Sequence, residues 1–273
     1  MAKTDAIATK QDKTETALAV VPAGMEGMIT IDRPEGHDEG TLGTEGMTRD
    51  DISMPRIGLA QKMSPEIDKT SSKYIEGLSF MDLYHSQTHE NFGTGPLYFA
   101  ILKRERPRWV EFKPIEQGGG IKDKDVKAND PRADFGPNGE KPAATMFRDY
   151  VVLLLNSFDP ADPLKSVVAL SLKSSGLKAA KYLNFLTTLR GDKLICKGVY
   201  KLTSSHETDK KTQGVYAVYK FDNAGWLAPD SIVEKTAIEL FESWKDRELE
   251  VEREDPDSFD PVVLEREATA PEM

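Results

Sequence analysis

Two histidines with metal-ligand spacing are the first residues in this chain that could do chemistry. His85 and His89 are four residues apart, which would place both on one side of a helix. Their surroundings, LYHSQTHENFG, predict a strand followed by a turn, and no glutamate stands between them as in the metalloprotease motif. We therefore expect no metal site here, and a hydrolase using these histidines is the weakest hypothesis.

Other candidates for catalysis also favour a structural interpretation. Asp123, Asp125, Asp130 and Asp134 resemble a carboxylate cluster, but lysines and arginines interleave with them, which favours a solvated loop. The single cysteine, Cys196, allows no disulfide or cysteine-based zinc site within the chain, and we expect a small buried side chain. No phosphate-binding loop, dinucleotide fingerprint or nucleophile elbow occurs. The sequence predicts no enzyme, no catalytic residue and no cofactor.

The positive signal is a mixture of basic and aromatic residues. Single-stranded nucleic acid needs cations near its phosphates and aromatic faces on which unpaired bases stack. Residues 98–113 and 200–220 contain both kinds, and lysines near residue 175 add charge. The predicted DNA-binding residues are Lys103, Arg104, Arg106, Arg108, Trp109, Phe112, Lys113, Lys173, Lys178, Tyr200, Lys201, Tyr216, Tyr219 and Lys220.

The alternative for these aromatic residues is the hydrophobic core. One face of each strand must point inward, so about half of the strand aromatics are expected to be buried. Trp109 and Phe112 have opposite parity, and Tyr216 has the parity opposite to Tyr219. The sequence leaves open which of them face outward.

The elements expected to position these residues are mainly strands. We predict strands at 74–84 with a break at Gly77, at 97–103 and 108–113 around a turn at Pro107, and at 148–156 and 166–173. A long loop is predicted at 115–145. A helix is predicted after an N-cap at Ser175, with Ala179, Tyr182, Leu183, Leu186 and Leu189 on its apolar face.

The remaining residues predict a hairpin and a second helix. Gly198–Ser204 and Gly214–Phe221 form the hairpin, and Ser231 with Glu234 forms a capping box that opens the C-terminal helix. Strand runs with one inserted helix favour a mainly-β fold, and an OB-like Greek-key barrel is the first choice.

The charge is distributed unevenly along the chain. The net charge is -10, but residues 1–51 carry 11 acids and 5 bases, and residues 246–273 carry 11 acids and 3 bases. The middle segment, 52–245, therefore carries 24 acids and 28 bases. We expect a disordered acidic N-terminal segment at 1–51, one mildly basic domain at 52–245 and an acidic tail at 246–273. A mildly basic domain makes a nucleic-acid partner admissible.

Membrane and secretory segments are not predicted. The longest apolar stretch, 151–155, has the length of a strand, and the N-terminus lacks the features of a signal peptide. We expect a cytoplasmic protein.

Several long segments resemble one protein family. Residues 55–67, 74–86, 95–112, 129–155, 169–184 and 221–227 look like a group of tailed-bacteriophage proteins that is similar to phage single-stranded DNA-binding proteins of OB-fold type. The resemblance implies sequence-tolerant binding of single-stranded DNA in replication and recombination. It also implies that the acidic C-terminal tail recruits replication proteins.

Two functional classes therefore stand beside the hydrolase. The first is a non-enzymatic single-stranded DNA-binding protein. The alternative is a phage structural or protein-interaction factor that does not bind nucleic acid. Salt-dependent binding of an oligonucleotide separates the two.

Overall fold

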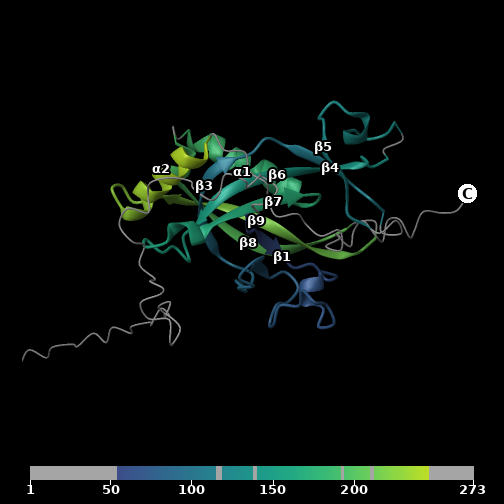
Figure 1. The fold of residues 1–273 in the computed structure, drawn as a ribbon, viewed down its shortest axis with the longest axis horizontal. Helices are drawn as coiled ribbons and strands as arrows, with labels where there is room; N and C mark the ends of the chain where they lie inside the picture. The colour runs from purple at the N-terminus through teal and green to yellow at the C-terminus, as the bar shows by residue number, and fades with distance from the viewer. Residues whose placement is uncertain (1–53, 115–118, 138–139, 192–193, 210–211, 246–273) are drawn as a thin grey trace, which may run out of the picture. The chain divides into compact units, whose positions relative to one another are not determined.

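A computed structural model describes residues 54–245, apart from 115–118, 138–139, 192–193 and 210–211 (Figure 1). The predicted acidic ends therefore lie outside the described residues. The strands are β1 (Ile57–Leu59), β2 (Leu83–His85), β3 (Leu97–Arg104), β4 (Arg108–Phe112), β5 (Ile121–Val126), β6 (Ala144–Leu154), β7 (Val167–Lys173), β8 (Gly198–Thr208) and β9 (Val215–Trp226). The helices are α1 (Gly176–Arg190), between β7 and β8, and α2 (Ile232–Trp244), after β9.

One antiparallel sheet of seven strands forms most of the fold. Its strand order is β5-β4-β6-β3-β8-β9, and β7 pairs with β6. The strand β6 lies at the centre because it pairs with β7 on one edge and with β3 and β4 on the other. A strand that has neighbours on both edges and apolar layers on both faces needs apolar side chains at every position. This explains the uninterrupted apolar composition of residues 150–154 (YVVLL). The prediction of a central strand here is confirmed.

The strands β3 and β4 are present as predicted, but the predicted turn at Pro107 does not reverse the chain. Both pair antiparallel with β6: Arg104 lies opposite Tyr150, and Arg108 lies opposite Phe147. They therefore run in one direction as two parts of a single extended segment. The backbone N–H of Glu105 still donates to the carbonyl of Asp149 at 2.9 Å, so the chain stays beside β6 between the two parts. Pro107 therefore interrupts the hydrogen-bonded pairing with β6 but does not reverse the direction of the chain.

The mainly-β class, the inserted helix and the C-terminal helix are all confirmed. The structure differs from the expected barrel in closure, because the described part of the sheet is open. Residues 55–61 lie between two of its edges. On β7, the N–H of Ala169 donates to the carbonyl of Pro55 at 2.7 Å. On β9, the side-chain amide of Gln61 pairs with both backbone groups of Ala217, at 2.9 and 3.0 Å. At the edge of β9, the Gln61 side chain thus makes the two backbone hydrogen bonds that a neighbouring strand would otherwise make.

Both faces of the sheet are buried, each under one helix. On one face, Phe99, Val152 and Leu170 pack with Ala180 and Leu183 of α1. On the other face, apolar residues of β3, β6 and β7 pack with Ala237 and Leu240 of α2. The alternation of side chains along each strand supplies both layers. Cys196 is fully buried in the second layer, as the sequence predicted, and burial raises the pKa of its thiol to about 11.

Two predicted segments differ from the structure. Within the predicted loop at 115–145, residues 121–126 form β5, an edge strand on β4 whose polar composition hid it. In the predicted strand at 74–84, only the end is extended, because turns occupy most of it. No helix among the described residues is long and apolar enough to cross a membrane.

The last predicted elements form as expected. The hairpin of β8 and β9 is longer than predicted, pairing from Gly198 and Trp226 to Thr208 and Val215. The helix α2 begins after Ser231, whose hydroxyl oxygen accepts from the N–H of Glu234 at 3.1 Å. The Glu234 carboxylate accepts from the N–H of Asp230 at 2.8 Å, so the reciprocal bond of the capping box reaches one residue further back than usual.

Candidate nucleic-acid interface

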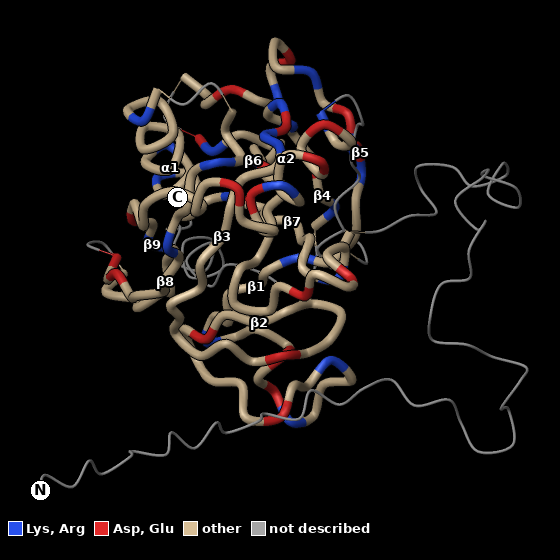
Figure 2. Tube along the Cα trace, turned by 90° about the vertical axis from the view of Figure 1, so that its left-hand side faces the viewer, with Lys and Arg blue, Asp and Glu red and all other residues tan. Residues whose placement is uncertain are grey.

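The predicted DNA-binding residues do not gather in one groove. Most belong to β3, β4, β7, β8, β9 and α1, while Arg106 lies just after β3 and Lys113 just after β4. Figure 2 shows Lys and Arg interspersed with Asp and Glu over the described part of the chain. Their positions divide them into core residues, residues held in ion pairs, and exposed residues.

The tyrosines of the hairpin mostly serve the fold. Tyr200 is 1% exposed, and its ring packs 5.7 Å from that of Phe99. Tyr219 is partly buried against the same core, and its hydroxyl donates to the carbonyl of Ile57 at 3.4 Å. Tyr216 is half-buried and donates to Glu207 at 3.2 Å. The stacking role predicted for Tyr200 does not fit its burial, because only 1% of this residue is exposed.

Arg108 and Lys173 belong to a polar cluster on the sheet. The Arg108 guanidinium bonds the Asp149 carboxylate at 2.6 Å, and Asp149 also accepts from the Ser171 hydroxyl at 2.5 Å. The buried ring of Phe147 lies 4.4 Å from the Arg108 guanidinium carbon and 5.9 Å from the Lys173 ammonium. Arg108 compensates a nearly buried carboxylate, so its charge is already matched within the fold.

Three predicted lysines are held in ion pairs. The salt bridges join Lys103 to Glu105 at 2.8 Å, Lys178 to Glu207 at 3.1 Å and Lys201 to Asp222 at 2.8 Å. Lys178 and Lys201 are exposed enough for solvent to weaken these pairs, and a phosphate can compete for them.

The remaining predicted residues lie on the surface or half-buried on β4. The side chains of Arg104, Arg106, Lys113 and Lys220 are exposed, while Trp109 and Phe112 are half-buried. Phe112 packs 6.2 Å from Phe147. Arg104 lies beside α1, where its guanidinium donates to the amide oxygen of Asn184 at 3.4 Å.

The helix α1 carries two exposed aromatic residues, Tyr182, which the sequence places on the predicted apolar face, and Phe185, which the sequence pattern does not single out. Tyr182 is 48% exposed and Phe185 is 53% exposed, and their rings stack with centroids 6.2 Å apart. Leu189 is 66% exposed on the same stripe. Lys178 precedes these residues at helical spacing, so all four share one side of the helix. We call Lys178, Lys181, Tyr182 and Phe185, together with Arg104, which contacts Asn184 of the same helix, the α1 surface.

The sequence of α1 explains why this side points outward. The buried positions are Gly176, Ala180 and Leu183, and Ala179 and Leu186 are partly buried. The predicted apolar face at 179, 182, 183, 186 and 189 was therefore partly wrong, because α1 is apolar on two sides and periodicity alone does not decide between them. Gly191 ends the helix in a left-handed conformation with a φ of 64°. Ser175 makes no side-chain capping bond.

The charge of α1 is one-sided. It contains Lys178, Lys181 and Arg190 and no acidic residue, in a chain with 46 acids. The helix α2, in contrast, contains three glutamates. The α1 surface therefore combines stacked rings with positive charge, and the one ion pair described above for its lysines joins Lys178 to Glu207 of β8.

Arg190 fixes the C-terminal end of α1 to the hairpin. It donates to the carbonyl of Val199 at 3.2 Å, to the amide oxygen of Asn223 at 2.6 Å and to the carbonyl of Gly225. Its guanidinium carbon lies 4.3 Å from the ring centroid of Trp226, which is 61% exposed. A third exposed aromatic ring thus stands at this end of the helix.

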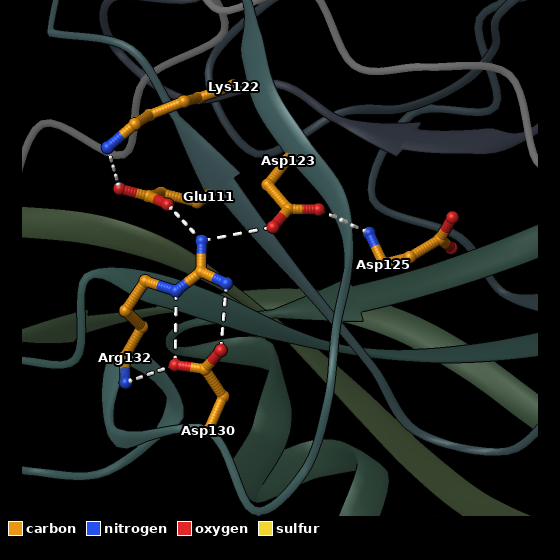
Figure 3. Close-up of polar contacts among 6 residues, drawn as sticks. All are labelled: Glu111, Lys122, Asp123, Asp125, Asp130 and Arg132. Atoms are coloured by element: carbon orange, nitrogen blue, oxygen red, sulfur yellow. Dashed lines mark hydrogen bonds and ion pairs between the residues drawn. The ribbon is translucent and has the colours of Figure 1, made fainter.

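Two of the four aspartates for which the sequence favoured a solvated loop, Asp123 and Asp130, instead meet Glu111 around Arg132 (Figure 3). Arg132 pairs with Glu111 at 2.7 Å, with Asp123 at 3.0 Å and with Asp130 at 2.8 Å. Hydrogen bonds from Arg132 lower the pKa of Asp130 to about 2, and hydrogen bonds from Lys122 and Arg132 lower the pKa of Glu111. The network fastens residues 130–132 to β4 and β5, which is a structural role. The backbone N–H of Asp125 donates to the Asp123 carboxylate. The backbone N–H of Asp134 donates to the carbonyl of Pro131 and ends the short 3-10 turn at 131–133.

The two histidines lie at a strand end and in the turn that follows it. His85 is buried, and its Nδ1 accepts from the N–H of Thr88 at 3.0 Å within the turn that follows β2. His89 has a positive φ of 59° in that turn. The turn context predicted from the sequence is confirmed.

These features define a mainly-β protein with an open antiparallel sheet, two covering helices and a basic, aromatic surface on α1. Comparison with family models gives one match, to the Pam3 phage gp34-like proteins, over residues 27–250. The chain belongs to this family of phage proteins, which confirms the phage part of the resemblance. No curated protein and no solved structure matched the chain.

Proposed function

We propose that this phage protein binds single-stranded DNA without sequence preference, during replication or recombination, through the α1 surface. The proposal assigns it no catalytic activity and no cofactor. The observation that carries it is the stacked, half-exposed pair Tyr182 and Phe185 on a helix that has cations and no acids.

The chemistry of this surface matches the two needs of a single strand. Aromatic rings stack on unpaired bases of any sequence, and each stacked base contributes about 1–3 kcal/mol. The cations attract phosphates and release counterions, which makes binding salt-dependent. Lys178 and Lys181 lie within a few residues of the two rings along α1, and Arg104 of β3 contacts the same helix at Asn184.

The revised site keeps only part of the predicted set. Arg104 and Lys178 remain, and Arg106 is a further exposed cation beyond the end of β3. Tyr200 and Arg108 leave it because the fold already uses them. Tyr182 and Phe185 replace the hairpin tyrosines as stacking platforms.

The test is a fluorescence anisotropy titration of the full chain with labelled oligo-dT and with a duplex of equal length. We expect the single strand to bind more tightly, with an affinity that falls as salt rises. Lack of binding at low salt, or equal affinity for the duplex, would refute the proposal.

A second function, a phage structural or interaction factor, is favoured by Leu189. This aliphatic side chain is 66% exposed on the same side as Tyr182 and Phe185, and nucleic acid does not require it. An apolar stripe at this spacing also suits a protein partner. This function predicts that oligo-dT does not bind and that Leu189→Ser weakens association with another phage protein.

A further inference from the structure

A pocket of about 410 Å³ lies beside the α1 surface. The end of β3, the C-terminal half of α1 and the end of α2 enclose it, with Arg104, Thr188 and Lys245 among its lining residues. The pocket forms beside a stretch of strand edge that lacks a neighbouring strand. The hairpin strand β8 pairs with β3 only from Leu97 to Ala100, and β5 begins to pair with β4 at Trp109. Between these points the edge of the β3–β4 segment has no neighbouring strand among the described residues.

The polar lining of the pocket is cationic. Lys103, Arg104 and Lys245 line it, and none of the described lining residues is acidic. Lys103 and Lys245 have acidic partners outside the lining, Glu105 and Glu242. The hydrogen bond of Arg104 goes to the neutral amide of Asn184. A cationic cavity without a carboxylate favours an anionic ligand.

The other lining residues give the pocket an apolar side. Aliphatic and aromatic surface comes from Leu102, Ile195, Tyr200 and Phe241. Thr187 and Thr188 donate their hydroxyl hydrogens to the carbonyl of Asn184, which leaves oxygen lone pairs able to accept. Pockets that hold small organic ligands measure about 300–1,000 Å³ and combine apolar walls with a few polar groups. The volume and lining fit a ring system that carries a phosphate.

We infer that this pocket binds one nucleoside monophosphate unit, with its base against Phe241 and Ile195 and its phosphate between Arg104 and Lys245. Such a unit comes either from a bound DNA strand or from a free nucleotide. The inference rests on the proposed function for the first source, because Arg104 belongs to both the pocket and the α1 surface. One unstacked nucleotide would enter the pocket while its neighbours stack on Tyr182 and Phe185.

The experiment places carboxylates in the pocket without altering the core or the stacked rings. Lys245→Glu and Thr188→Glu are combined, since both side chains are exposed. The control is Lys165→Glu, an exposed lysine outside the pocket whose partner is Asp162. Each full-length variant is titrated with dTMP, with inorganic phosphate and with labelled oligo-dT.

We expect the wild-type protein and the control to bind dTMP more tightly than inorganic phosphate. The double variant should bind both dTMP and oligo-dT at least about tenfold more weakly, the loss of one charge-assisted contact. If dTMP binding depends on the pocket but oligo-dT does not bind at all, the ligand is a free nucleotide and the proposed function fails while the pocket stands. If the double variant binds dTMP as the wild type does, or if phosphate alone binds equally well, the inference is overturned.

Discussion

At the scale of single residues, the structure separates side chains that the sequence presents as equivalent. Tyr200 and Tyr182 each stand beside a lysine, yet one is buried under α1 and the other is half-exposed on it. Parity along a strand shows which residues share a face, but the partner covering that face decides which of them are buried. The sequence therefore shows which residues alternate along a strand but not which of them the fold leaves exposed.

Tyr200 provides a test of this separation. We expect Tyr200→Ala to lower the free energy of unfolding by about 3–5 kcal/mol, because it leaves a cavity beside Phe99. Tyr98→Ala, at an exposed position on the neighbouring strand, should change it by less than about 0.5 kcal/mol. Chemical denaturation measures both values. Similar stability of the two variants would contradict the assignment of Tyr200 to the core.

The Arg132 network predicts a dependence of stability on pH. The folded-state pKa of Asp130 is about 2, below its ordinary value of 3.8, and the pKa values of Glu111 and Asp123 are also lowered. At acid pH the unfolded chain therefore binds more protons than the folded chain, so this stabilisation is lost as the pH falls from about 4 towards 2.

We expect Arg132→Gln to be less stable than the wild type at pH 6, and the difference between them to shrink as the pH falls below 4. Urea unfolding at a series of pH values measures this. The substitution Lys165→Gln, which breaks an exposed ion pair elsewhere, serves as the control. An unchanged difference between Arg132→Gln and the wild type across this pH range would show that the network does not stabilise the fold.

At the scale of elements, the strongest sequence patterns were the most reliable. The apolar run of β6 and the capping residues of α2 were predicted and are present. The strand β5 was missed because its residues KDKD have no apolar face, and ion pairs to Arg132 and Glu111 stabilise it instead. The continuous direction of β3 and β4 was not predicted, because Pro107 is typical of a turn. Both strands pair with β6, and this long-range pairing leaves no signal in the sequence near Pro107.

The two faces of α1 can be compared with a matched pair of leucines. Leu183→Ala should cost about 2–5 kcal/mol of stability, because Leu183 is fully buried. Leu189→Ala should cost less than about 0.5 kcal/mol, because Leu189 is 66% exposed. Thermal or chemical unfolding checks both. Equal losses would mean that the outer side of α1 is covered.

At the scale of the whole molecule, the net charge is -10, while α1 presents cations. The segment 246–273 alone contributes 11 acids and 3 bases. Removing it takes away a charge that repels DNA phosphates and can compete for the α1 surface. The proposed role of this tail in recruiting replication proteins is a separate function that the same deletion would weaken.

We expect a chain ending at residue 245 to bind oligo-dT severalfold more tightly than the full chain at low salt. The difference should diminish above about 0.5 M salt, where charges are screened over a few ångströms. Anisotropy titrations at several salt concentrations measure it. Equal affinity of the two chains at low salt would contradict a repulsive or competing tail.

The central claim is that the stacked rings of α1 bind unpaired bases. Its most direct test is the affinity of the Tyr182→Ala, Phe185→Ala double variant for oligo-dT. The control is Phe135→Ala, which removes a ring that is 72% exposed elsewhere on the surface. Each stacked ring contributes about 1–3 kcal/mol, so the double variant should bind roughly 30-fold more weakly or worse, with unchanged stability. The control should bind as the wild type does. If the double variant keeps wild-type affinity, α1 is not the surface that binds single-stranded DNA.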